Sequence, residues 1–170
     1  MIQKEHQHIQ NAKHNLQIVL IAENIRTPEN VGMMMRLSDA FGVAKIYFVG
    51  KHELELTTKI KRASRNTYKT MNYTFERDGK EQIKKLAEEG YQSISLEITE
   101  KSEPIQNIKL HPHKKILLVV GSERKGVSEE LLQLCQYHYH IPMYGNNSSI
   151  NVVNALSIGL YKITEKVSAE

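Results

Sequence analysis

Cysteine is almost absent from this sequence, since Cys135 is the only one among 170 residues. A single thiol cannot form an internal disulfide, which fits a protein of the reducing cytoplasm. Hydrophobic runs are also short. The longest candidate is Ile116–Val120, whereas a membrane-spanning helix needs roughly 20 apolar residues. The N-terminus lacks the apolar core of a secretory signal. These absences exclude a disulfide scaffold and predict a cytoplasmic protein that does not enter a membrane.

Repeats, low-complexity tracts and Pro/Gly-rich linkers are missing too. We therefore expect a polar N-terminal arm over residues 1–15 and a single domain over residues 16–170, long enough to bury a core. The arm contains His6, His8 and His14, but no cysteine or carboxylate stands at a fixed ligand spacing from them, so no metal site is predicted. The net charge of +4 permits binding to nucleic acid without requiring it.

Segments typical of strands alternate with segments typical of helices along much of the chain. The predicted strands are residues 16–22, 45–49, 92–98, 116–120 and 137–141. The predicted helices are residues 28–41, 79–89, 129–135 and a largely apolar terminal helix, 149–166. This alternation indicates an α/β fold with a mainly parallel sheet and helices on both of its faces.

Two loops follow predicted strands and carry few apolar side chains. The 121–128 loop has two glycines five residues apart, but Val127 follows Gly126 where a phosphate-binding P-loop requires lysine. The loop Ile141–Asn151 is rich in Gly, Asn and Ser, which can present backbone groups to a ligand at close range. An ordinary turn followed by a helix cap at Ser149 explains the second loop equally well.

A basic segment covers residues 59–69 and contains five cations and no acid. Ser, Asn and Tyr lie among these cations, a mixture that is typical of surfaces in contact with phosphate. The alternative is a solvated face without a ligand. We predict that the segment binds RNA through Lys59, Lys61, Arg62, Arg65 and Lys69.

Arg36 lies within the predicted helix 28–41, beside the apolar stripe that contains Asn30 and Met34. One interpretation is a side chain that lies along the apolar surface and pairs with Asp39 three residues later. The other interpretation is an arginine held at the rim of a binding site, with Asn30 beside it. The helix alone does not distinguish the two.

Three motifs occur in the order and spacing of one protein family: Asn30–Arg36, Gly121–Val127 and Ile141–Val152. Together they resemble the SpoU (TrmH-like) branch of the SPOUT RNA methyltransferases, over residues 24–163. The resemblance implies transfer of a methyl group from S-adenosylmethionine to a ribose 2′-hydroxyl of RNA, either tRNA, which we slightly favour, or rRNA. It also implies a homodimer and a C-terminal trefoil knot. The sequence departs from the family's pattern at Ile150, where leucine is more usual, and at Val153–Ala155.

The resemblance assigns roles to individual residues. Those implied in cofactor binding are Leu96, Gly121, Glu123, Gly126, Ile141, Met143, Ser149 and Ile150. Arg36 is implied to act on the ribose hydroxyl, and a surrounding network would consist of Asn30, Glu123, Ser149 and Asn151. Because arginine stays protonated in proteins, it fits a base poorly, and we favour an arginine that holds the RNA backbone while a phosphate relays the proton.

Two other functions are compatible with the same scaffold. The chain could be a catalytically silent RNA-binding or ribosome-assembly protein, or it could methylate a base instead of a ribose. The arm of about fifteen residues is too short for an additional RNA-binding domain. RNA binding would then depend on the basic segment and on the other subunit of a dimer.

Overall fold

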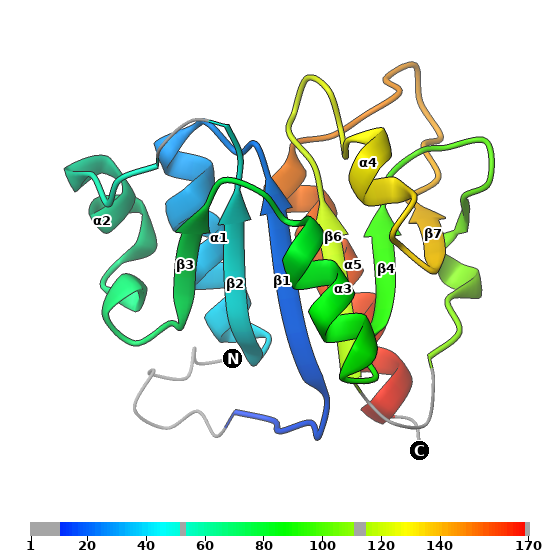
Figure 1. Ribbon diagram of the computed structural model, residues 1–170, viewed down its shortest axis with the longest axis horizontal. Helices are drawn as coiled ribbons and strands as arrows, with labels where there is room; N and C mark the ends of the chain where they lie inside the picture. Colours follow the sequence, from blue (N-terminus) through cyan, green and yellow to red (C-terminus); the bar gives the residue numbers. More distant parts are fainter. Residues whose placement is uncertain (1–10, 52–53, 111–114, 169–170) are drawn as a thin grey trace, which may run out of the picture.

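The computed structural model describes residues 11–51, 54–110 and 115–168 (Figure 1). The described strands form one seven-stranded sheet in the order β3-β2-β1-β6-β4-β7-β5, and every neighbouring pair is parallel. The strands are β1 (Gln17–Glu23), β2 (Val43–Val49), β3 (Tyr73–Glu76), β4 (Gln92–Leu96), β5 (Glu103–Pro104), β6 (Lys115–Val120) and β7 (Tyr137–His140). The predicted parallel α/β fold is therefore confirmed.

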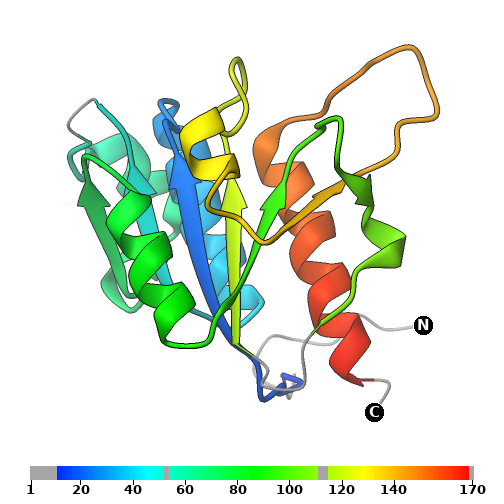
Figure 2. The same ribbon diagram turned by 45° about the vertical axis from the view of Figure 1, so that its right-hand side comes forward.

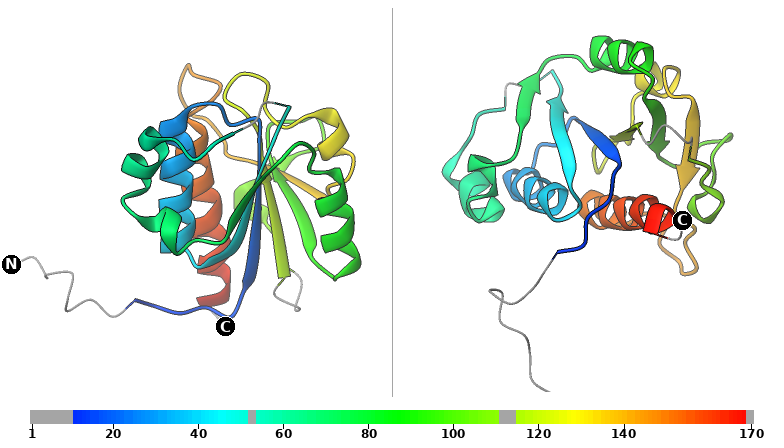
Figure 3. Two further views of the ribbon diagram at one scale, coloured as in Figure 1. Left: turned by 60° about the vertical axis from the view of Figure 1, so that its left-hand side comes forward. Right: turned by 90° about the horizontal axis from the view of Figure 1, so that it is seen from below.

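Helices cover both faces of the sheet (Figure 3). One face carries α1 (Pro28–Ala40), α2 (Thr58–Ser64) and α5 (Val152–Ser168), and the other carries α3 (Lys80–Glu88) and α4 (Glu129–Leu132). Two short 3₁₀ turns, η2 (Thr67–Lys69) and η3 (Ile105–Asn107), complete the described elements. The prediction of helices on both faces is confirmed.

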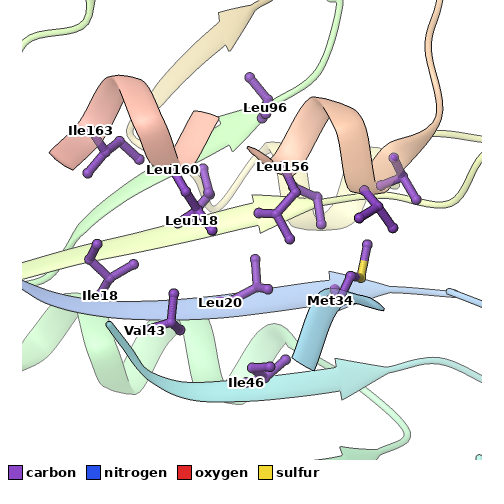
Figure 4. Packing of buried hydrophobic residues seen from close by; sticks show 14 of the residues in the cluster. Ile18, Leu20, Met34, Val43, Ile46, Leu96, Leu118, Leu156, Leu160 and Ile163 are labelled. Atoms are coloured by element: carbon purple, nitrogen blue, oxygen red, sulfur yellow. The ribbon is translucent and has the colours of Figure 1, made fainter. Parts of the chain in front are cut away.

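The core consists of two apolar clusters, one on each face of the sheet. Ile18 and Leu20 of β1 pack beneath α1 and α5, as Figure 4 shows, while Val19 and Ile21 belong to the cluster on the α3 side. A central parallel strand that is buried on both faces has to be apolar at nearly every position. This is why β1 and β6 stand out as continuous apolar runs in the sequence.

The structure corrects several predicted boundaries. The strand β3 was missed, because it is a four-residue strand at the edge of the sheet whose residues are all only half-buried. The short α2 and β5 were also missed. The helix predicted to begin at Ser149 begins at Val152, and the helix predicted over residues 129–135 ends at Leu132.

Cys135 therefore lies just after α4 and not within a helix. Its side chain is buried in the cluster on the α3 side of the sheet. Burial raises the pKa of the Cys135 thiol to about 12, which keeps the thiol protonated and unreactive near neutral pH. This agrees with the interpretation of Cys135 as a small apolar core residue.

Part of the predicted N-terminal arm is attached to the domain. Residues 1–10, with His6 and His8, lie outside the described residues. The His14 ring accepts a hydrogen bond from the backbone N–H of Leu16 at 3.2 Å, and its Nε2 lies 2.8 Å from the carbonyl oxygen of Phe41. His14 thus fixes the chain just before β1. In the part of the chain that the structure describes, no helix combines the length and apolar composition needed to cross a membrane.

Two adjacent methionines of α1 provide a matched test of this packing. Met34 is fully buried against the sheet, whereas Met33 is 46% exposed. We expect Met34→Ala to lower the free energy of unfolding by about 2–4 kcal/mol, since the cavity it leaves cannot be filled by its neighbours. Met33→Ala should cost less than about 1 kcal/mol when unfolding is measured on the monomeric chain, in which Met33 is in contact with water. Denaturant unfolding monitored by circular dichroism measures both. Equal losses in the two variants would contradict the orientation of α1.

Candidate functional site

A cavity of about 340 Å³ opens at the carboxyl edge of the sheet. Its lining comes from the ends of β4, β6 and β7, from the loops that follow them and from the first turn of α5. Figure 2 shows the Ile141–Asn151 loop extending beyond the sheet between β7 and α5. The carboxyl ends of parallel strands are the usual ligand-binding position in open α/β sheets.

The residues predicted to bind a cofactor all line this cavity. They are Leu96, Gly121, Glu123, Gly126, Ile141, Met143, Ser149 and Ile150. They come from three separate stretches of the sequence, and the ends of neighbouring strands bring them together. Their contact with a cofactor remains a prediction.

The 121–128 loop forms a tight turn that only glycine can close. The backbone N–H groups of Ser122 and Gly126 donate to each other's carbonyl oxygens, at 3.2 and 2.9 Å. A Cβ atom on Gly121 would lie 1.9 Å from the carbonyl carbon of Gly126. Gly126 itself has φ +63°, and its Cβ would lie 2.2 Å from Oε2 of Glu97. Gly121 is therefore required by close backbone contact, and Gly126 by its positive φ and its contact with the Glu97 side chain, and neither by a P-loop.

Two carboxylates hold the second half of this loop. Glu97, directly after β4, accepts a hydrogen bond from the backbone N–H of Val127 at 2.9 Å. Glu23, at the end of β1, accepts one from the backbone N–H of Ser128 at 2.7 Å and is 8% exposed. The Ser128 side chain then caps α4 by accepting a hydrogen bond from the backbone N–H of Leu131. The loop is thus fixed relative to two strands of the sheet.

A chain of hydrogen bonds joins the three sequence motifs. Asn30 of α1 donates through Nδ2 to Oε1 of Glu123. Asn151, just before α5, donates through Nδ2 to Oδ1 of Asn30 at 3.4 Å. Asn30 is buried, so these contacts replace the hydrogen bonds to water that its amide loses. Three of the five residues predicted to be catalytic therefore form one network beside the cavity.

The other two predicted catalytic residues lie outside that network. Ser149 lines the cavity but is exposed. Arg36 is exposed on α1 and does not line the cavity. Within the described residues, no ion pair joins Arg36 to Asp39. The guanidinium is accordingly accessible to a ligand that lies across α1.

The predicted helix cap at Ser149 is wrong. The side chain of Asn151 caps α5, since its Oδ1 accepts a hydrogen bond from the backbone N–H of Val153 at 2.8 Å. Asparagine is at least as good a cap as serine, and its position next to Asn30 fixes the start of the helix. Ser149 is consequently free of a structural role in α5.

The basic segment lies on α2 and η2, and all five of its predicted RNA-binding cations are exposed. The ammonium groups of Lys61 and Lys69 lie 5.9 and 5.8 Å from the centre of the Tyr68 ring. Gly32 lets α2 approach α1 closely, because a Cβ there would lie 2.6 Å from the Cβ of Ala63. The glycine of the first motif therefore positions the basic segment beside α1.

Two polar residues of the cavity outside the three motifs, Glu97 and His140, were not predicted from the sequence. Both fall inside predicted strands, 92–98 and 137–141. The observed strands end at Leu96 and His140, so these side chains belong to the site. A more exact placement of the strand ends would have identified them.

Comparison with known proteins identifies the family. The profile of the SpoU rRNA Methylase family matches residues 17–161, most of the chain. The chain belongs to the SpoU rRNA methylase family. The resemblance carried by the three motifs is thereby confirmed.

The chain is also similar to curated proteins over most of its length. A putative TrmH family tRNA/rRNA methyltransferase of Staphylococcus saprophyticus is 26% identical over 157 residues, which are 92% of this chain and 62% of that protein. The chain thus spans less than two thirds of that relative's length.

Solved structures agree in fold. An AdoMet-bound rRNA methyltransferase from Sinorhizobium meliloti superimposes with a TM-score of 0.80 at 20% identity, over 95% of this chain and 60% of that one. An RNA 2′-O ribose methyltransferase superimposes with a TM-score of 0.77 at 20% identity, over 96% and 61%. At this identity the likeness concerns the fold alone.

The corrected cap can be tested with two substitutions. Asn151→Ala removes the side-chain acceptor for the first turn of α5 and the donor to the buried Oδ1 of Asn30, so it should lower the free energy of unfolding by about 1–3 kcal/mol. Ser149→Ala removes an exposed hydroxyl that has no hydrogen-bond partner among the described residues, and should change the free energy of unfolding by less than about 0.5 kcal/mol. Urea denaturation measures both values. A larger loss for Ser149→Ala than for Asn151→Ala would restore the original assignment of the cap.

Proposed function

We propose that this chain is the catalytic domain of an S-adenosylmethionine-dependent RNA 2′-O-ribose methyltransferase that acts on tRNA or rRNA. The observation that carries the proposal is the hydrogen-bonded chain Glu123–Asn30–Asn151 beside the cavity at the sheet edge. It unites the three motifs of the family at one place. The proposal treats residues 16–170 as a single domain.

The cavity has the character expected of a site for an adenosyl cofactor. Its volume of about 340 Å³ falls within the range of small-molecule sites. Aliphatic side chains such as Leu96, Ile141 and Ile150 offer apolar surface for a flat base, and the 121–128 loop offers backbone polar groups. Glu123 places a carboxylate at the same site, which suits a ligand that carries a positively charged sulfur. When bound, S-adenosylmethionine would supply the activated methyl group.

The ribose hydroxyl has to lose its proton as it attacks the methyl group. In the proposed mechanism, Arg36 holds an RNA phosphate next to the reacting ribose, and the phosphate takes up the proton. Guanidinium suits this role because it stays protonated and can bind two phosphate oxygens at once. The hydrogen bonds among Asn30, Glu123 and Asn151 hold α1 in a fixed position relative to the cavity. The exposed Ser149 hydroxyl is available to the RNA.

The homodimer and the knot are also part of the proposal. Apolar side chains are exposed on α1 and α5, namely Met33 at 46%, Ile158 at 40% and Tyr161 at 59%. These helices pack against each other, so their exposed sides can form one apolar surface for a second copy. A C-terminal trefoil knot is supported by the order of the sheet, in which β6 lies between β1 and β4 while α5 returns to α1.

Transfer of a tritiated methyl group to RNA tests the proposed activity. The chain should label bulk tRNA or rRNA, and nucleoside mass spectrometry should identify 2′-O-methylated ribose. Arg36→Ala should reduce the initial rate about 100-fold or more, since it removes a charge that acts at the reacting centre. Its affinity for S-adenosylmethionine should not change, because Arg36 lies outside the cavity.

The control for this assay is Lys84→Ala, which removes an exposed cation from α3 on the opposite face of the sheet. It should retain the wild-type rate. If the wild-type chain binds the cofactor but labels neither tRNA nor rRNA, the alternative of a silent RNA-binding protein is favoured. Methylated bases in place of methylated riboses would identify a base-modifying enzyme.

The proposed RNA-binding surface is tested by charge reversal. Arg62→Glu combined with Arg65→Glu should weaken RNA binding about tenfold or more near physiological salt and should lower the salt dependence. The affinity for S-adenosylmethionine should be unchanged. Lys84→Glu with Lys85→Glu on α3 makes the same change of charge on the other face and should have little effect. Fluorescence anisotropy with labelled RNA measures binding, and parallel loss of RNA and cofactor affinity would mean that the basic segment is structural.

A further inference from the structure

Glu97 lines the cavity, and none of the three sequence motifs contains it. It is the first residue after β4 and is half-buried. Its Oε1 accepts the backbone N–H of Ile98 at 3.0 Å, and its Oε2 accepts the backbone N–H of Val127 at 2.9 Å. The backbone N–H groups of Ile98 and Val127 each hold one carboxylate oxygen, so they fix the orientation of the carboxylate plane.

This carboxylate has capacity for further hydrogen bonds. An ionised carboxylate offers about four acceptor sites, and the two backbone donors use one on each oxygen. The carboxylate also lies directly against Gly126, where a Cβ would lie 2.2 Å from its Oε2. Glu97 thus presents two adjacent, oriented acceptors, one on each oxygen, at the cavity.

The other charged groups of the cavity are held less firmly or lack acceptors. Glu123, the second carboxylate among the described lining residues, is held through Oε1 alone by the amide of Asn30, whereas both oxygens of Glu97 are held by backbone donors. Arg124 and Lys125 carry donors only. A ligand group with two neighbouring hydroxyl donors is therefore complementary to Glu97.

We propose that Glu97 binds the vicinal 2′- and 3′-hydroxyls of the ribose in the adenosyl ligand. The proposal rests on the proposed function, because it assumes an adenosyl ligand in this cavity. In dinucleotide-binding α/β folds, a carboxylate of this kind hydrogen-bonds a ribose 2′-hydroxyl. Glu97 also bonds Val127, so the same side chain connects the ligand to the 121–128 loop.

The test measures the affinities of S-adenosylhomocysteine and its 2′-deoxy and 3′-deoxy analogues by isothermal titration calorimetry. The wild-type chain should bind each deoxy analogue about tenfold more weakly than the parent, the usual cost of a lost hydrogen bond to a charged group. Glu97→Gln should bind the parent about tenfold more weakly and should discriminate between parent and analogues less than about threefold. Its amide oxygen can still accept from Val127, so the loop should remain folded.

Glu100→Gln, which changes an exposed carboxylate outside the cavity, should behave as wild type. If Glu97→Gln keeps the tenfold discrimination, or loses affinity equally for all three ligands, Glu97 only holds the loop and the inference is overturned. Thermal unfolding of each variant shows whether the fold is retained. If the wild-type chain binds neither S-adenosylmethionine nor S-adenosylhomocysteine, the proposed function itself fails. Failure of the inference about Glu97 alone leaves the wild-type affinity for both ligands intact.

Discussion

The hydrogen bonds of the buried Asn30 amide are the contacts on which the whole site depends. This side chain bonds Glu123 on one side and Asn151 on the other, and so joins three segments that are distant in sequence. A buried amide without partners would cost about 1–3 kcal/mol, so the folded chain strongly favours having all three segments in place. The sheet makes this possible, because β1 and β6 are neighbours and the segments that follow them meet at one edge.

The remainder of the edge is organised by contacts between carboxylates and backbone. Glu23 and Glu97 stand at the ends of two strands that do not pair with each other, and each holds one N–H of the 121–128 loop. Gly121 and Gly126 allow that loop to fold onto itself at van der Waals limits. The two carboxylates and the hydrogen bonds between Ser122 and Gly126 keep the loop in one shape before a ligand binds. Binding then costs less conformational entropy.

Much of this could be predicted from sequence, and the exceptions have physical causes. The central strands were found because burial on both faces leaves a continuous apolar run. The edge strand Tyr73–Glu76 was missed because half-buried residues give no such signal. The cap of α5 was assigned to Ser149 because either residue type can cap, and only the contact with Asn30 selects Asn151. Glu97 was missed because a strand end shifted by two residues moves a side chain from the sheet into the site.

Some motif residues stabilise the structure of the site, whereas Arg36 is accessible to a ligand. Gly32, Gly121, Gly126 and Asn151 each satisfy a packing or capping requirement of the chain. Arg36, by contrast, is exposed and forms no ion pair with Asp39 among the described residues. Its guanidinium is therefore accessible to a ligand. Because α2 packs on α1, the cations of the basic segment lie beside the helix that carries Arg36. A polyanion that lies across α1 would therefore contact both Arg36 and the basic segment.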